Sequence, residues 1–251
     1  MKKLQPFEIL RNKQREIDEE IRAMGDDAQP VCDGVADEAA YLKSPKGRVM
    51  WLLKEPYDNG GDFRWSIVKD CFMKADSLWE HKEHKDGIAD EMWRNKTWQM
   101  VASVMEGFRK GKRWDELPRL SERKNRHILD NLKSIAWVNV SKTIAKTESS
   151  DGGFVGRYKK VWREIVLKQI EILDPRIIVC ARTFVRCLWN DAALKFPPLK
   201  GSEWRRKGSF DGVYRFGDKD TFVIDAYHPG RKGLTYANDL IGVMQQIHSK
   251  L

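Results

Sequence analysis

The sequence predicts an α/β protein with a three-layer αβα fold. A mostly parallel four-stranded sheet forms the central layer, and a helical extension precedes it at the N-terminus. Four short apolar runs recur along the chain, and segments with helical spacing of apolar residues separate them. The chain has 251 residues, of which 41% are hydrophobic. A chain of this length can bury a core without disulfides or a structural metal.

The four apolar runs are the predicted strands. Each is bounded by turn or charged residues, is too short for a helix and is too continuous for a strand with one polar face. We therefore expect a sheet covered on both faces, with parallel pairing because helices connect the strands. The expected strands span 48–53, 135–140, 176–181 and 221–226, with a further hairpin or edge strand at 213–217, and the expected helices span about 91–108, 122–133, 157–172, 183–190 and 235–249.

The N-terminal region is predicted to be an attachment to this domain. Phe7, Leu10, Ile17 and Ile21 lie among charged residues at the spacing of an amphipathic helix, which the turn residues at 25–27 end. We expect residues 1–45 to form a helix and a connecting segment packed on the main domain. Residues 46–251 then form the α/β domain.

The charge of the chain is positive and unevenly distributed. Lys and Arg number 46 against 37 Asp and Glu, a net charge of +9. The first 50 residues hold 9 basic and 10 acidic residues, so the remainder carries a net +10. This excess favours an anionic partner such as nucleic acid. Basic clusters at 107–126 and 200–207 have two interpretations. They either contact the phosphates along a nucleic-acid backbone, or they are solvated surface residues that keep the protein soluble.

The spacing of the cysteines and the hydropathy pattern indicate which cofactors the protein binds and where in the cell it is located. Cys32, Cys71, Cys180 and Cys187 include no C-x₂-C pair, so we expect no zinc ribbon, no iron–sulfur cluster and no other metal or cofactor. A reducing, intracellular setting follows. No run approaches the ~18 apolar residues of a membrane span, and no signal-peptide core follows Met1. We therefore expect a soluble, cytoplasmic protein without a membrane partner.

Polar residues follow the predicted strands at the edge where ligands bind in α/β sheets. Glu55 precedes Pro56 after the first strand, and His228 precedes Pro229 after the fourth. A carboxylate there can stabilise developing positive charge, and an imidazole can donate to an oxygen that becomes anionic. Asn139, at the end of the second strand, offers both an amide donor and an acceptor. This set fits the charge pattern of N-glycosidic bond cleavage.

At these residues the sequence resembles the uracil-DNA glycosylase superfamily. The similar segments are Leu53-Lys-Glu-Pro-Tyr57, Trp137-Val-Asn-Val-Ser-Lys-Thr143, Asp174-Pro-Arg-Ile-Ile-Val-Cys-Ala181 and Ile224-Asp-Ala-Tyr-His-Pro-Gly230. They occur in the family's order between about residues 46 and 248. The resemblance implies a divergent uracil-DNA glycosylase-like domain without the iron–sulfur cysteine pattern.

The resemblance also implies roles for individual residues. Glu55 and His228 are the expected catalytic residues. The expected substrate-binding residues are Lys54, Pro56, Tyr57, Phe63 (with Trp65 as the second candidate for the stacking ring) and Asn139, which matches the family's base-reading position. The expected DNA-binding residues are Lys142, Pro229, Gly230, Arg231 and Lys232, with Arg231 or Leu234 as the residue that enters the duplex.

The expected function is that of a monomeric DNA glycosylase in base-excision DNA repair. It would hydrolyse the N-glycosidic bond of uracil or another deaminated base flipped out of single- or double-stranded DNA. Two alternatives stay open. Lys54, Gly230 and the loop 231–234 depart from the family's motifs, which favours a nucleic-acid-binding protein with the same fold but no excision activity. The other alternative is that the chain is an unrelated α/β enzyme that acts on a free nucleotide or nucleoside.

Overall fold

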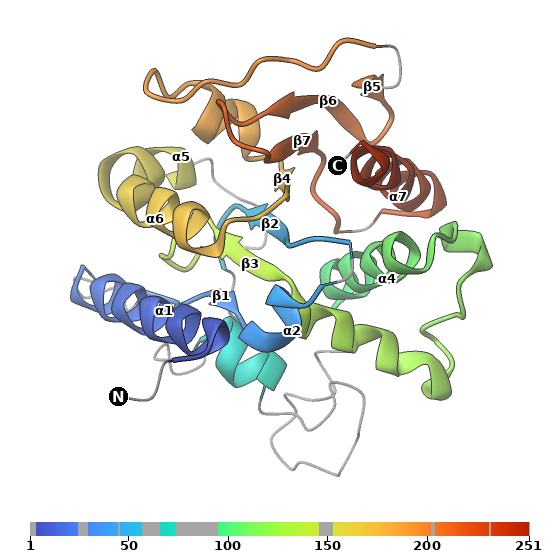
Figure 1. Cartoon of the computed structure of the whole chain (residues 1–251), viewed down its shortest axis with the longest axis horizontal. Coiled ribbons are helices and arrows are strands. Elements are labelled where there is room, and N and C mark those ends of the chain that lie inside the picture. Colours follow the sequence, from blue (N-terminus) through green and yellow to red (C-terminus); the bar gives the residue numbers. More distant parts are fainter. Residues whose placement is uncertain are drawn as a thin grey trace.

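A mixed β-sheet forms the centre of the computed structural model, which describes residues 4–24, 30–44, 46–56, 66–73, 95–145, 153–201, 204–230 and 232–250. Within these residues the sheet has seven strands in the order β1-β3-β2-β4-β7-β6-β5 (Figure 1). The strands are β1 (Gly34–Val35), β2 (Val49–Leu53), β3 (Ala136–Asn139), β4 (Ile177–Ala181), β5 (Arg205–Lys207), β6 (Phe210–Arg215) and β7 (Phe222–Ala226).

The four predicted apolar runs are neighbours in this sheet. β2 pairs in parallel with β3 and with β4, and β4 pairs in parallel with β7. The sheet is nevertheless larger than the predicted four strands, because β1 adds antiparallel to β3 and the β5–β6 hairpin adds antiparallel to β7. Of these additions, β6 overlaps the hairpin or edge strand predicted at 213–217. β1 has two residues and β5 is the charged segment Arg205–Lys207, so neither carries an apolar pattern that sequence could reveal.

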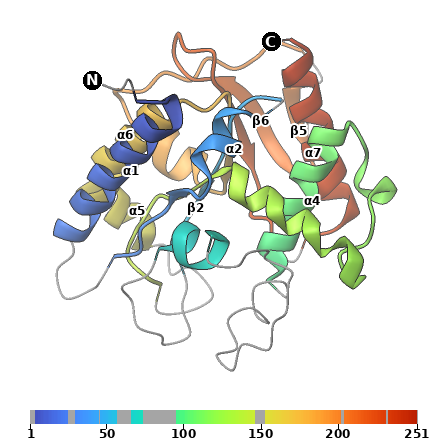
Figure 2. The same ribbon diagram turned by 60° about the horizontal axis from the view of Figure 1, so that its bottom comes forward.

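Helices cover both faces of the sheet, as Figures 1 and 2 show. The α/β class predicted from the sequence is confirmed. The α-helices are α1 (Pro6–Ala23), α2 (Glu38–Leu42), α4 (Lys96–Lys110), α5 (Gly153–Arg157), α6 (Arg163–Leu173) and α7 (Leu234–Ser249). Other helical forms comprise 3₁₀-helices at Trp114–Glu116 and Arg123–Ser134 and π-helical segments at Ile67–Met73, Tyr158–Trp162 and Phe184–Trp189.

Side chains of β2 alternate between two cores, which explains why its sequence is apolar throughout. Trp51 and Leu53 pack in the core that contains α4 and α7. Met50 and Leu52 pack in the core on the opposite face, which contains α6. All four are buried. A strand buried on both faces places its polar chemistry beyond its carboxyl end, where the backbone leaves the core.

The N-terminal segment is joined closely to the main domain. Ile17 and Ile21 of α1 are buried against Trp162 and Ile165. The amide of Gln14 accepts a hydrogen bond at 2.7 Å from the backbone N–H of Val35 in β1, and it donates to the carboxylate of Glu38 at 3.1 Å. The first strand of the sheet therefore belongs to this N-terminal segment.

Candidate functional site

The carboxyl ends of β3, β2, β4 and β7 meet at one edge of the sheet, and backbone hydrogen bonds tie the loops there together. The backbone N–H of Ser141 donates to the carbonyl of Lys54 at 2.9 Å. That of Ala145 donates to the carbonyl of Pro56 at 2.8 Å. Pro56 is itself buried. The loop after β2 is thus held against the loop after β3, which limits where Lys54 and Glu55 can point.

The His228 imidazole at the end of β7 is an uncharged hydrogen-bond donor. Its Nδ1 accepts a hydrogen bond from the backbone N–H of Gly230 at 3.1 Å. Burial, together with the positive charges of Lys54 and Lys232, lowers the pKa of His228 to about 4. The ring is therefore neutral at pH 7, and because Nδ1 accepts, its single proton is on Nε2.

Gly230 brings the His228 loop close to the first turn of α4. A Cβ atom at Gly230 would lie 3.2 Å from Nδ1 of His228 and 3.2 Å from Oγ1 of Thr97. Pro229 is buried, and its carbonyl accepts from the backbone N–H of Lys232 at 3.3 Å. Pro229 and Gly230 thus set the shape of the loop, whereas Lys232 is exposed and can contact a ligand.

Glu55 is held by an arginine that the sequence did not single out. The Nη2 of Arg157 donates to Oε2 of Glu55 at 3.0 Å, and the Glu55 side chain is only 4% exposed. The Nε of Arg157 also donates to Oγ of Ser141 at 3.2 Å. This ion pair keeps the Glu55 carboxylate in one position, with Oε2 occupied by the guanidinium.

Positive charges gather around Lys54. The Lys54 ammonium lies 5.7 Å from the centroid of the Phe154 ring, and the Arg186 guanidinium lies 5.9 Å from the same centroid. Burial lowers the pKa of Lys54, the charges of Arg186 and Arg182 lower it further, and Glu55 opposes them. Crowded cations of this kind are stabilised by an anionic ligand such as a phosphate.

Arg182, directly after β4, adopts an uncommon backbone conformation. Its φ of +64° lies in the left-handed region, and its backbone N–H donates to the carbonyls of Cys180 (3.0 Å) and Ala226 (2.8 Å). Its guanidinium lies 3.9 Å from the centroid of the Tyr227 ring, and the Lys232 ammonium lies 5.6 Å from that centroid. Strained backbone held in this way is frequent at functional sites.

Asn139 faces the interior. Its side-chain Nδ2 donates to Oδ2 of Asp33 at 3.1 Å, and its backbone N–H donates to the same oxygen at 2.7 Å. Asn139 is 2% exposed, and its strand β3 is separated from β7 by β2 and β4. In this arrangement the amide nitrogen is engaged by Asp33 and is not presented to a base beside His228.

The prediction that Lys142 binds DNA is wrong for this structure. The Lys142 side chain has no exposed surface, and its ammonium donates to Asp33, to the carbonyl of Asn139 and to Oε1 of Gln169 at 2.7 to 2.9 Å. No DNA phosphate can reach it there. Sequence alone placed Lys142 in a polar loop after a strand, and it could not show that Asp33, more than a hundred residues earlier, comes to lie beside it.

Some predicted site residues lie outside the described part of the chain, and the sequence-based prediction left out three arginines of the site. Tyr57, Phe63, Trp65 and Arg231 are not among the described residues. Arg157, Arg182 and Arg186 belong to the site but were not among the predicted site residues. Arg182 directly follows a strand, so the rule that selected Glu55 and His228 also points to it. No sequence pattern distinguishes Arg157 and Arg186 from other surface arginines on helices.

Comparison with known proteins does not assign a family. A scan of protein-family models gives no match to the chain, and a search of curated protein sequences gives none either. Within the described ranges, no set of three or more His, Cys, Asp or Glu side chains is arranged to hold a metal ion. The helices described here include none that is both long and apolar enough to cross a membrane.

Proposed function

We propose that the chain is a DNA glycosylase that hydrolyses the N-glycosidic bond of uracil or another deaminated base flipped out of DNA. The observation that carries the proposal is the placement of His228 at the carboxyl edge of the sheet and among cations, with Nδ1 accepting from the Gly230 backbone N–H so that Nε2 is left to donate. A neutral N–H donor suits an oxygen that gains negative charge as the base departs. The neighbouring Lys54 and Lys232 stabilise the same charge.

The proposed reaction is a hydrolysis without a cofactor. The bond between the sugar C1′ and the base nitrogen breaks, and its electron pair leaves with the base. The oxygen of a water molecule forms a bond to C1′, and a water proton ends on the base nitrogen. His228 holds its proton on Nε2 and donates a hydrogen bond to an oxygen of the departing base. The Glu55 carboxylate stabilises the positive charge that develops on the sugar.

The expectation that the chain acts on DNA is supported by the cations at this edge. Lys54, Arg182, Arg186 and Lys232 lie around the ends of β2, β4 and β7, where they can bind the phosphates that flank a flipped nucleotide. The expectations that the chain acts as a monomer and in the cytoplasm stay predictions from the sequence.

A second candidate function is nucleic-acid binding without excision. The ion pair between Glu55 and Arg157 favours it, because a carboxylate oxygen that already accepts from the guanidinium is less available to orient a water molecule. The engagement of the Asn139 nitrogen by Asp33 favours it as well, since one expected contact to the base is lost.

An excision assay separates the two candidates. Oligonucleotides that contain uracil, hypoxanthine or xanthine, in single- and double-stranded form, are incubated with the wild-type protein and with the variants Glu55→Ala and His228→Ala. Loss of a preorganised donor typically slows such reactions by ~10²–10³-fold, so His228→Ala should lose nearly all activity. His127→Ala is the matched control, because His127 is an exposed histidine on the 3₁₀-helix Arg123–Ser134.

Two outcomes would reject the glycosylase proposal. Cleavage at the wild-type rate by a folded His228→Ala protein would show that this ring has no part in the reaction. Salt-dependent DNA binding by the wild type, with no cleavage of any of the three bases, would establish the binding function instead.

A further inference from the structure

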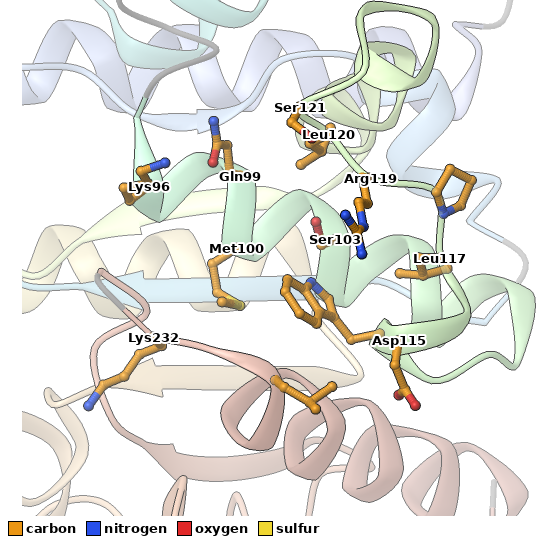
Figure 3. Close-up of a pocket in the computed structure, with 13 residues that line it drawn as sticks. Lys96, Gln99, Met100, Ser103, Asp115, Leu117, Arg119, Leu120, Ser121 and Lys232 are labelled. Carbon is orange, nitrogen blue, oxygen red and sulfur yellow. The ribbon is translucent and has the colours of Figure 1, made fainter.

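A cavity of about 770 Å³ adjoins the site described above and shares Lys232 with it (Figure 3). Helix α4, the segment 114–121 and the start of α7 form its walls. Its size is typical of cavities that bind small molecules or single nucleotides. Lys232 links it to the candidate site, because this residue lines the cavity and its charge also acts on His228.

The cavity has cations on both sides of Met100. In the view of Figure 3, Lys96 and Lys232 lie at one end and Arg119 lies beyond Met100, toward the end that holds Asp115 and Leu117. Lys96, Arg119 and Lys232 are exposed, and none of them forms an ion pair with another described residue. An anionic ligand would therefore meet three positive charges that no carboxylate of the described residues pairs.

Asp115 is the acidic side chain in the lining, and its charge is already engaged. Its Oδ1 accepts from Nδ2 of Asn238 at 3.0 Å and from Nε of Arg113 at 3.2 Å. The Trp114 backbone N–H donates to Oδ1 of the same Asn238 at 2.7 Å. Asn238 of α7 thus fixes the segment that carries Trp114, so this wall of the cavity is preorganised.

The apolar lining suits a planar ring. Trp114 is half-buried and Leu234 is 43% exposed, so both keep surface available within the cavity while they contact the protein. Aromatic side chains flanked by cations are how proteins bind single nucleic-acid strands: bases stack on the rings, and the phosphates meet Lys and Arg. A purely apolar ligand would leave the three cations unused.

We infer that this cavity binds one nucleotide of the DNA strand that continues from the His228 site, with its base against Trp114 and its phosphates at Lys96, Lys232 and Arg119. The inference rests on the proposed action on DNA. A strand is favoured over a free nucleotide because cations lie on both sides of Met100, and because Lys232 at one end is shared with the candidate site.

The test measures binding to an undamaged, fluorescently labelled single-stranded oligonucleotide by anisotropy, so its result does not depend on excision. Arg119→Ala should weaken binding several-fold and lower the slope of log K against log salt by roughly 0.7, the value for one phosphate contact. Trp114→Leu should weaken binding by roughly fivefold to a hundredfold, and Trp114→Phe should retain most of the affinity, because a ring is still present.

Arg15→Ala is the matched control, since Arg15 is an exposed arginine of α1 without an ion pair to another described residue. This variant should bind the oligonucleotide as the wild type does. Unchanged affinity and salt slope in Arg119→Ala, or equal effects of Trp114→Leu and Trp114→Phe in folded protein, would overturn the inference. Displacement of the oligonucleotide by thymidine 5′-monophosphate, when the nucleotide is added at the same concentration as the oligonucleotide, would also overturn the inference. None of these results depends on the His228→Ala excision assay, so the two proposals can fail separately.

Discussion

The ammonium of Lys142 lies 2.7 Å from Oδ1 of Asp33, and neither side chain has any exposed surface. Asp33 also accepts from Nε2 of Gln169 at 2.8 Å and from both nitrogens of Asn139. This buried network joins the N-terminal segment, the end of β3 and α6. It holds the loop after β3 in place, although no member of the network is exposed to a ligand.

Removal of the cation from this pair should destabilise the protein strongly. Lys142→Met leaves the Asp33 carboxylate buried without a cationic partner, which typically costs about 3–5 kcal/mol in the free energy of unfolding. Urea denaturation at pH 7 measures this loss. Lys168→Met is the matched control, because Lys168 pairs with Glu20 on the surface and such pairs contribute at most ~1 kcal/mol. A Lys142→Met protein as stable as the control would contradict the prediction, and the double variant Asp33→Asn with Lys142→Met should lose less than the two single losses together.

Acid should destabilise the folded protein through His228. Its pKa is about 4 in the folded state and about 6.5 in an unfolded chain. Between these values the unfolded state binds more protons, so the free energy of unfolding falls as the pH is lowered from 6.5 to 4, by up to ~1.4 kcal/mol per pH unit. His228→Gln should flatten this part of the curve in unfolding experiments at several pH values. An unchanged slope would show that the ring titrates normally in the folded state.

Asp225 should act with the opposite sign in an overlapping range. Burial and the neighbouring Asp211 raise the pKa of Asp225 to about 6, against about 3.9 in an unfolded chain. The folded state therefore binds more protons between pH 3.9 and 6, and the stability that this contributes is lost as the pH rises through 6. The unfolding free energy of Asp225→Asn, relative to the wild type, should rise between pH 4 and 7. Asp211→Asn should weaken the same dependence, because it removes one of the two causes.

Two helix glycines should respond to alanine in opposite directions. A Cβ at Gly107 of α4 would lie 2.4 Å from Cδ1 of Ile241 and 2.8 Å from the carbonyl oxygen of Lys112, which is backbone and cannot rotate away. Gly107→Ala should therefore cost roughly 1–3 kcal/mol of stability by overpacking. A Cβ at Gly242 of α7 would meet nothing within 4 Å, so Gly242→Ala should stabilise by roughly 0.5–1 kcal/mol. Thermal unfolding of both variants checks this, and equal effects would contradict the close approach of α4 and α7.

Much of the framework of the candidate site could be predicted from sequence because it follows local rules. The apolar runs that became β2, β3, β4 and β7 were recognisable because strands buried on both faces need continuous apolar residues. Glu55 and His228 stood out because each follows such a strand and precedes a proline. β5 has no such pattern and was not predicted, whereas its partner β6 overlaps the hairpin or edge strand expected at 213–217.

The sequence by itself determined the α/β class, the main strands and the edge at which polar residues collect, since periodicity and strand ends are properties of neighbouring residues. Only the tertiary structure decided the partners of those residues. It placed Arg157 on Glu55, turned the Asn139 amide toward Asp33 and buried Lys142, which from its neighbours alone had seemed a surface cation. The physical reason is that a charged or polar side chain must be satisfied wherever the fold removes it from water, and the groups that satisfy it come from segments far apart in the chain.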